Sequence, residues 1–187
     1  RSIQEMNILS ENFELERYGV KVRLATEQDA FFILSLRTDE RLSRFLHKTD
    51  NDLVKQLEWM KAYKEREHKG EDYYFIYTND DGPFGLNRIY DIHDDCGTGG
   101  SWLCKPDTDV EASIATLLIM RDIMFDCIGL QNDLFDVRKG NSHVQKIHKM
   151  MGAKMIGETD LDYLFKLSKS DYQVSKEKIL QLLNLKE

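Results

Sequence analysis

Segments with the alternation typical of strands and segments with the spacing typical of helices are interleaved along this 187-residue chain. Apolar, aromatic or β-branched side chains recur in strand patterns at 20–24, 73–77, 85–92, 101–105, 134–137, 154–157 and 163–167. Apolar residues at helical spacing occupy 31–36, 53–63, 114–128, 144–151 and 176–185. The resulting order, β-α-α-β-β-β-α-β-α-β-β-α, predicts an α/β or α+β protein.

Capping and turn residues mark the boundaries of these elements. Thr26, with Asp29 three positions later, resembles a capping box, and Asp50 or Asn51 can cap the second helix. Gly129 gives the long helix an end signal. The segment 93–100 is rich in turn residues, and we expect a turn there. Residues 1–18 are polar, and we expect a loosely attached leader before one domain over 19–187.

Composition excludes several classes of protein. Apolar residues make up 41% of the chain, enough for one packed core, but no run approaches the roughly 18–20 needed to cross a membrane. The 26 basic and 33 acidic residues give a net charge of −7, which argues against binding to nucleic acid. The three cysteines are widely spaced and fit a reducing compartment. We therefore expect an acidic cytoplasmic protein that binds neither nucleic acid nor membrane.

Four segments carry a resemblance to a known family: 22–29, 84–91, 100–106 and 137–153. In this order they are similar to the first strand and helix start, the third strand, the fourth strand and the strand-Asn-helix-Gly signature of the GNAT superfamily of acyl-CoA-dependent N-acyltransferases. Ala153 stands where the signature has an aromatic residue. The resemblance is strongest to bacterial ribosomal-protein and amino-sugar acetyltransferases. It implies a mixed, mostly antiparallel sheet that is splayed between its fourth and fifth strands and flanked by helices.

The resemblance also implies acetyl-CoA as co-substrate, held in the slot between the splayed strands. Backbone groups of the fourth strand would bind its pantetheine arm, at Trp102, Leu103 and Cys104, unless these are ordinary core residues. Its pyrophosphate would lie at the N-terminus of the long helix, at Ala112, Ser113 and Ile114. The chain departs from the family here, because it lacks the usual glycines and basic residue and carries Asp109 and Glu111.

Two residues after the predicted strand 134–137 are candidates for the chemistry. The resemblance implies that Asn141 helps to hold the cofactor, although Asn is also a preferred helix cap. His148 stands seven positions later, where the family often has a Tyr that protonates the leaving thiolate. Histidine can donate a proton near neutral pH, although a lone His on an apolar helix face can also be a core residue.

The general base is open at this stage, since the fourth strand has no Glu. The candidates are Asp91, with His93 and Asp94 beside it, or a water held by backbone carbonyls. The run 91–96 also contains His, Asp and Cys, which are competent metal ligands, but no second cluster supports it and we expect no metal. Arg37 and Arg88 could hold a phosphate or carboxylate of the substrate, or form surface salt bridges.

These observations predict an acetyl-CoA-dependent N-acetyltransferase that acts on a primary amine of a small molecule, with a nucleotide-linked amino sugar as the expected acceptor. Two alternatives remain at this stage. The acceptor could be a protein N-terminus or a ribosomal protein, since an acidic enzyme attracts basic partners. The chain could also be a non-catalytic GNAT-fold protein that binds a ligand or partner, because of the unusual loop at 109–114. Both a monomer and a homodimer are compatible with the sequence.

Overall fold

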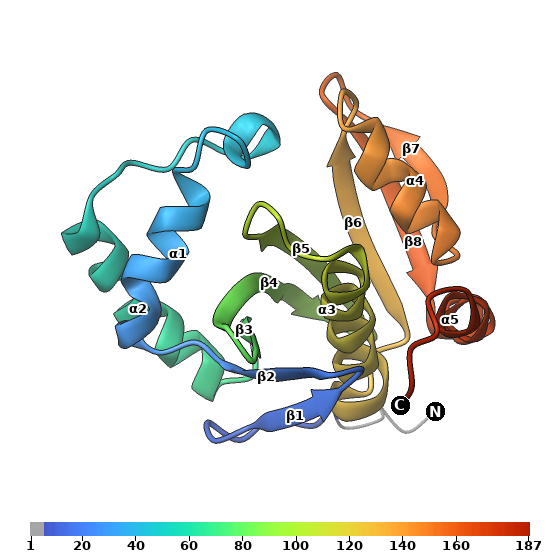
Figure 1. The fold of residues 1–187 in the computed structure, drawn as a ribbon, viewed down its shortest axis with the longest axis horizontal. Coiled ribbons are helices and arrows are strands. Elements are labelled where there is room, and N and C mark those ends of the chain that lie inside the picture. The colour runs from blue at the N-terminus through green and yellow to red at the C-terminus, as the bar shows by residue number, and fades with distance from the viewer. Residues whose placement is uncertain (1–5) are drawn as a thin grey trace.

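The computed structural model describes residues 6–187, and its strands form one eight-stranded sheet (Figure 1). The strands are β1 (Glu14–Arg17), β2 (Val20–Leu24), β3 (Tyr73–Asn79), β4 (Gly82–His93), β5 (Cys96–Cys104), β6 (Asn132–Arg138), β7 (Lys154–Glu158) and β8 (Asp162–Ser168). Their order in the sheet is β1-β2-β3-β4-β5-β6-β8-β7. Every neighbouring pair is antiparallel except β5 and β6, which are parallel. The expected mixed, mostly antiparallel sheet is confirmed.

Helices cover both faces of this sheet. The α-helices are α1 (Ala30–Arg37), α2 (Leu53–His68), α3 (Val110–Asp122), α4 (Ser142–Met150) and α5 (Lys169–Leu182). Short 3-10 turns lie at η1 (Glu27–Asp29) and η2 (Ser43–Phe45), and α3 continues as a π-helical turn, η3 (Ile123–Ile128). Gly129 then ends the segment with a left-handed φ of 91°, which glycine adopts without a steric cost. Figure 1 shows α1 and α2 at one side and α3, α4 and α5 toward the other.

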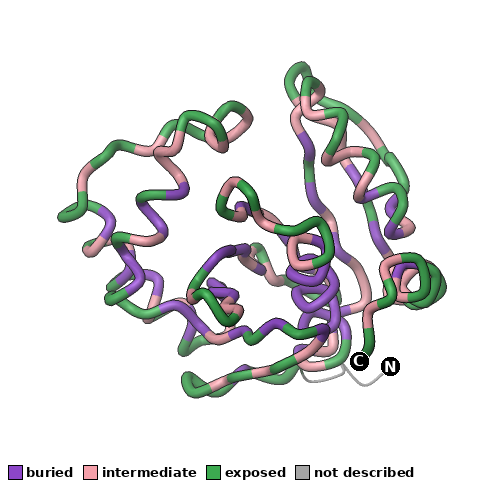
Figure 2. The backbone as a smooth tube through the Cα atoms, viewed as in Figure 1, coloured by how far each residue is buried: buried purple, intermediate pink, exposed green. Residues whose placement is uncertain are grey.

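The central strand β3 explains why five consecutive residues, 73–77, are apolar or aromatic. Successive side chains of a strand point to opposite faces. Tyr73, Phe75 and Tyr77 pack with α3 in one core cluster, whereas Tyr74 and Ile76 pack with α1 and α2 in the other. A strand covered on both faces has no solvent side, so alternation disappears from its sequence. Figure 2 shows the same burial along most of α3.

The N-terminal segment is attached more firmly than the sequence predicted. Residues 14–17 of the expected leader form β1, which pairs with β2; residues 1–5 lie outside the described residues. Behind this hairpin, the buried carboxylate of Asp122 accepts hydrogen bonds from Tyr18 and Tyr172, both at 2.7 Å. Arg17 and Lys176 form ion pairs with it at 3.0 and 3.1 Å. One buried carboxylate on α3 thus ties the start of the chain to α5.

The turn expected at 93–100 is mostly strand. Only Asp94 and Asp95 separate β4 from β5, and Asp94 has a left-handed φ of 52°. The glycines that suggested a turn have a packing cause instead: a Cβ on Gly99 would lie 2.5 Å from Cε of Met120 on α3. Glycine in a strand often marks such a close approach.

Two helix starts also differ from the sequence-based expectation. The second helix is capped by Asp52, whose carboxylate accepts from the N–H groups of Val54 and Lys55, not by Asp50 or Asn51. The last helix begins at Lys169, with the hydroxyl of Ser168 as its cap, seven residues before the periodic segment. The added first turn carries Tyr172, which is buried and donates to Asp122 Oδ1 at 2.7 Å. Within residues 6–187 no helix combines the length and apolar character needed to cross a membrane.

Candidate active site

The two parallel strands β5 and β6 separate shortly after they begin. Only Cys96 with Asn132 and Gly97 with Asp133 are paired across them. Beyond that point side chains take over the bridging, since Thr98 Oγ1 donates to the carbonyl of Leu134 at 2.7 Å and Gly99 N–H donates to Asp133 Oδ1 at 2.8 Å. The expected splayed pair is therefore confirmed; it is the fifth and sixth strand here because β1 adds one strand.

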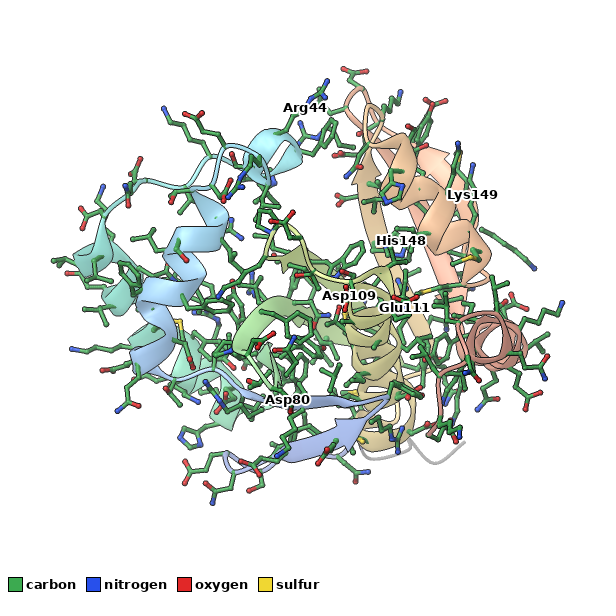
Figure 3. The ribbon with its side chains drawn as sticks, in the orientation of Figure 1. Arg44, Asp80, Asp109, Glu111, His148 and Lys149 are labelled. Atoms are coloured by element: carbon green, nitrogen blue, oxygen red, sulfur yellow. The ribbon has the colours of Figure 1, made fainter. Side chains whose placement is uncertain are left out.

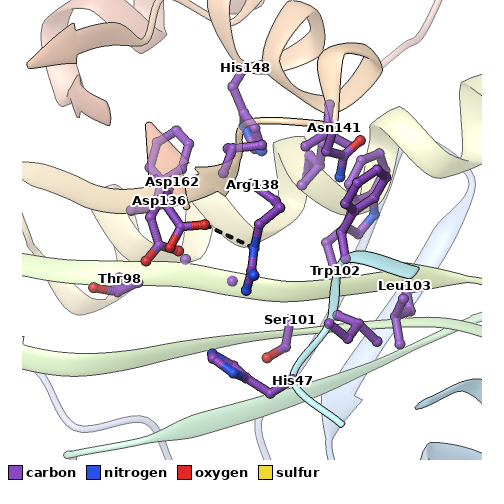
Figure 4. A pocket seen from close by; sticks show the side chains of 18 of the residues that line it. His47, Thr98, Ser101, Trp102, Leu103, Asp136, Arg138, Asn141, His148 and Asp162 are labelled. Carbon is purple, nitrogen blue, oxygen red and sulfur yellow. Dashed lines mark ion pairs between the residues drawn. The ribbon is translucent and has the colours of Figure 1, made fainter. Parts of the chain in front are cut away.

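A cavity of about 260 Å³ opens where these strands part, and we call it the main cavity (Figure 4). Its walls come from β5, β6, α4 and the segment 42–47 between α1 and α2. The residues that line it are Arg37, Leu42, Phe45, Leu46, His47, Tyr90, Thr98, Gly99, Gly100, Ser101, Trp102, Leu103, Leu117, Met120, Phe135, Asp136, Val137, Arg138, Asn141, Val144, His148 and Asp162.

A bulge in β5 shapes one wall of the main cavity. The pairing of β4 with β5 shifts register between Leu86 and Arg88, and Ser101 opposite this shift has a left-handed φ of 55°. Such bulges re-aim side chains and leave backbone groups unpaired. Trp102 lines the cavity and its indole N–H donates to Thr116 Oγ1 on α3 at 2.9 Å. The bulge therefore places a free strand edge beside the cavity.

The predicted cofactor residues divide into two groups. Trp102 and Leu103 line the main cavity, whereas Cys104 packs half-buried against the core and burial raises the pKa of its thiol. Ala112 lines a different cavity, of about 290 Å³, beside Lys105. The side chain of Ile114 is in the core, and Ser113 N–H bonds the carbonyl of Asp109 at 2.9 Å. The structure does not bring Cys104 or 112–114 to the main cavity.

The start of α3 carries two acidic side chains. Figure 3 shows Asp109 and Glu111 at this end of the helix. Asp109 is the N-cap residue, but its side chain makes no capping hydrogen bond. The first N–H groups of a helix have no partner within the helix and favour an anion, whereas the two carboxylates oppose one.

Asn141 lines the main cavity from the first position before α4. Its backbone carbonyl accepts from Gln145 N–H at 3.2 Å, but its side-chain amide makes no capping bond. The side chain of Asn141 therefore does not cap the helix through a hydrogen bond, and its cofactor role stays a prediction. The amide of Asn141 is free to bind a molecule in the cavity.

His148 belongs to a buried chain of polar contacts. Its Nδ1 lies 3.0 Å from Nη2 of Arg121 on α3, and Arg121 Nε donates to Asp133 Oδ2 at 3.1 Å. Asp133 in turn accepts from Gly99 N–H, so the chain links α4, α3, β6 and β5 at the point where the strands part. Arginine can only donate, and Nδ1 of His148 must therefore be the acceptor, which puts the imidazole proton on Nε2.

The pKa of His148 lies well below its usual 6.5, first because the ring is buried and second because Arg121 is positively charged. The side chain is therefore neutral at neutral pH. The role suggested by the sequence, proton donation by His148 near neutral pH, stays a prediction. A neutral ring can still offer its Nε2–H as a hydrogen-bond donor.

The lowered pKa of His148 has a consequence for stability. Below about pH 6.5 the unfolded chain binds a proton on this ring before the folded chain does, so acidification favours unfolding. We expect the free energy of unfolding to fall by up to about 1.4 kcal/mol per pH unit below 6.5 from this group. Urea denaturation between pH 5 and 7.5 measures the slope. His148→Gln should flatten it, while His143→Gln, at an exposed position of α4, should leave it unchanged; equal slopes in all three would contradict the assignment.

Arg37 and Arg88 converge on a second cavity, of about 270 Å³, which we call the side cavity. It lies between α2, β3, β4 and the segment 48–52, and Arg37 lines both cavities. Arg37 Nε donates to Thr49 Oγ1 at 3.0 Å, and within residues 6–187 no carboxylate pairs with it. Arg88 pairs with Asp72 at 2.7 Å and lies over the rings of Trp59 and Tyr90 at 5.0 and 4.7 Å.

The side cavity also contains unsatisfied buried polar atoms. Among the described residues, Tyr74 Oη and Arg88 Nε are buried and have no hydrogen-bond partner. Both residues line the cavity. Buried polar groups are usually paired. Two donors without partners in the cavity that Arg37 also lines therefore indicate a place for a hydrogen-bond acceptor. Both arginines line this cavity, and their role in holding a phosphate or carboxylate of the substrate stays a prediction.

The candidate base Asp91 does not line the main cavity. It lies exposed at the end of β4 with a left-handed φ of 47°, and its backbone carbonyl bonds His93 Nδ1 at 2.8 Å. The structure instead places Asp136 and His47 in the cavity, and sequence analysis missed both. Asp136 stands between Phe135 and Val137, so the alternation of that strand already showed it on the opposite face; no local signal shows that this face meets a cavity.

The solved structure of FdhC, described as a nucleotide-linked sugar GNAT, is 34% identical to this chain; the match covers 92% of this chain and 99% of FdhC, with a TM-score of 0.82. The chain belongs to the GNAT superfamily. Two further structures share the fold at lower identity. A GCN5-related N-acetyltransferase from Brucella melitensis is 12% identical (96% and 88% covered, TM-score 0.77). The ribosomal-protein-S5-alanine acetyltransferase from Vibrio fischeri is 15% identical (86% and 99% covered, TM-score 0.75).

No protein-family model matches this GNAT chain, and no match is found among curated proteins. Its similarity to FdhC supports an acetyltransferase at the level of the family. A spermidine N-acetyltransferase from Vibrio cholerae with the same fold has been solved with CoA and spermine bound. In the part of this GNAT chain that the structure describes, no group of three or more His, Cys, Asp or Glu side chains could hold a metal ion.

Proposed function

We propose that this GNAT chain is an acetyl-CoA-dependent N-acetyltransferase whose acceptor is a primary amine of a nucleotide-linked amino sugar. The observation that carries the proposal is the parting of β5 and β6 after two residue pairs, which leaves a free strand edge along the main cavity. A strand edge can bind an extended, amide-containing arm as if that arm were another strand. The similarity to a nucleotide-linked sugar GNAT supports the choice of acceptor.

The residues around the main cavity fit the proposed co-substrate, which would supply an activated thioester. The edge of β5 at Trp102 and Leu103 would bind the pantetheine arm, and the free amide of Asn141 would bind it from α4. The anionic end would extend beyond this cavity over the first turn of α3, at 112–114, where backbone N–H groups favour phosphate. Asp109 and Glu111 oppose that binding, and modest affinity is expected from their charge.

His148 would stabilise the charge on the departing sulfur. Because Arg121 holds Nδ1 as an acceptor, the Nε2–H of a neutral ring is left to donate. A donor fixed in advance needs no rearrangement when the charge develops. In this role His148 would donate a hydrogen bond to the sulfur and would not transfer a proton to it.

Arg37 and Arg88 would recognise the phosphate-bearing part of the acceptor. Arg37 lines both cavities and has no carboxylate partner among the described residues. Tyr74 Oη and Arg88 Nε, from residues that also line the side cavity, have no hydrogen-bond partner there. Guanidinium groups bind phosphate oxygens through paired, charge-assisted hydrogen bonds. A diphosphate at Arg37 would leave the sugar to reach the main cavity.

An acceptor panel with acetyl-CoA tests the proposal. Thermal stability should rise on addition of millimolar acetyl-CoA, because a ligand of the folded state stabilises it. Thiol release should then be fastest with nucleotide-linked amino sugars, compared with free amino sugars, spermidine and basic peptides. Faster release with basic peptides would favour a protein acceptor, and a thermal shift without any thiol release would favour a non-catalytic binding protein. No shift at all would refute the proposal.

Loss of the free guanidinium should weaken acceptor binding selectively. We expect Arg37→Met to raise KM for the nucleotide-linked sugar by roughly tenfold or more, because one charged hydrogen bond contributes about 1.5–3 kcal/mol. The thermal shift produced by acetyl-CoA should not change. Arg41→Met is the matched control, since Arg41 is exposed and already paired with Asp39 at 2.8 Å. Equal kinetics for both variants would exclude Arg37 from acceptor binding.

A further inference from the structure

Asp136 lies at the middle of β6, where the register places it opposite Leu164 of β8. Its neighbours Phe135 and Val137 are buried, and the alternation of the strand turns Asp136 the other way. It lines the main cavity, and Figure 4 shows it beside Asp162 in the space that Thr98 and Arg138 also border. A carboxylate thus stands on the strand that forms one side of the opening.

Two carboxylates share this wall, but only one is engaged. Arg138 Nε pairs with Asp162 at 3.2 Å, as the dashed line in Figure 4 shows. For Asp136, no ion pair and no hydrogen bond to another residue is found within 6–187. Asp136 is exposed to solvent at the cavity and its carboxylate makes no bond to a neighbour there, so it is available to a ligand that enters the cavity.

The charges around Asp136 favour a role in taking up protons. Burial and the nearby negative charge of Asp162 raise the pKa of Asp136, while His47 and Arg138 oppose that rise. Tyr90, from β4, also faces this region, and Asp136 helps to raise the pKa of its phenol. The groups that face Asp136 are therefore Asp162 of β8, Arg138 of β6, Tyr90 of β4 and His47 of the segment after η2.

We propose that Asp136 is the general base of the acetyl transfer; this inference rests on the proposed function. The acceptor ammonium gives one proton to the Asp136 carboxylate, and its nitrogen then forms a bond to the acyl carbon. As the carbon–sulfur bond breaks, the thiolate leaves with the bonding electrons and takes the second proton lost by the nitrogen, next to the Nε2–H of His148. Asp136 returns its proton to water. A base works best when its pKa is brought toward the working pH, and the surroundings of Asp136 do so.

The test compares steady-state rates of Asp136→Asn and wild-type protein with a nucleotide-linked amino sugar between pH 5.5 and 9. Asparagine keeps the shape of the side chain but cannot accept the proton. We expect kcat at pH 7 to fall about 100-fold, which is the usual contribution of a general base. The acidic limb of the pH profile should lie at higher pH in Asp136→Asn than in the wild-type protein. The thermal shift with acetyl-CoA should be the same in both. Asp160→Asn, an exposed carboxylate outside both cavities, is the control that should keep the wild-type rate.

Each other outcome has a definite meaning. Wild-type protein that is inactive with every amine would overturn both this inference and the proposed function. Active wild-type protein with an equally active Asp136→Asn variant would overturn the base alone, as would a loss confined to Asp91→Asn. Loss of the acetyl-CoA thermal shift in Asp136→Asn would also overturn it, because that result shows a binding role.

Discussion

Replacing Arg121 with methionine is expected to lower the free energy of unfolding by about 3–5 kcal/mol, the usual cost of stranding a buried charge. Arg121 and Asp133 are both fully buried, and their side chains pair at 3.1 Å. Without Arg121, the Asp133 carboxylate keeps only the N–H of Gly99 as a partner. Urea denaturation at pH 7 measures the change.

A double variant distinguishes this stranded charge from simple loss of packing. Arg121→Met with Asp133→Asn should recover about half of the lost stability, because a neutral amide can still accept from Gly99 N–H. Lys154→Met breaks an exposed pair with Asp171 and should change the free energy of unfolding by less than about 0.5 kcal/mol. A double variant no more stable than the single one would show that the charge of Asp133 is not the cause.

Filling the main cavity should abolish co-substrate binding while the fold persists. We expect Val144→Trp to weaken acetyl-CoA binding by about 1000-fold, which corresponds to about 4 kcal/mol. Val144 lines the cavity from α4 and is only partly buried, so an indole can enter the open volume without disturbing the closed core. Isothermal titration with acetyl-CoA measures the affinity, and circular dichroism checks the fold.

The matched control places the same indole on a helix away from the cavity. Val174 on α5 is 64% exposed, and Val174→Trp should bind acetyl-CoA as the wild-type chain does. If Val144→Trp still binds with wild-type affinity, the co-substrate does not occupy the main cavity. The result would then direct attention to the separate cavity beside Lys105 and Ala112.

Local patterns predicted most elements of the fold but misplaced those with a tertiary cause. Gly97, Gly99 and Gly100 suggested a turn, whereas they belong to a strand, and α3 approaches Gly99 too closely for a side chain. Residues 14–17 looked like part of a polar leader, yet β2 gives them a pairing partner and Asp122 binds the adjoining Arg17. Neither cause is visible in a short stretch of sequence, since Gly99 and Met120 lie on different elements and Asp122 is 105 positions from Arg17.

Only part of the candidate site could be predicted from the sequence, because the rest depends on contacts between separate elements. Asn141 stands directly before α4 and His148 lies on it; the family resemblance pointed to both residues, and both line the cavity. Asp91 stands near the end of another strand, β4, and only the tertiary structure shows that it does not line the cavity. The protonation state of His148 was also beyond sequence analysis, because its pKa is lowered by burial and then by Arg121, 27 positions away, which also fixes the tautomer.

The sequence by itself determined the order of strands and helices, which depends on periodicity that short stretches of chain specify. The family resemblance added the expected roles of Trp102, Leu103, Asn141 and His148. Only the tertiary structure decided where β5 and β6 part, which carboxylate faces the cavity and how Arg121 holds His148. Those features arise from contacts between distant segments, and their energies depend on burial, which no local pattern records.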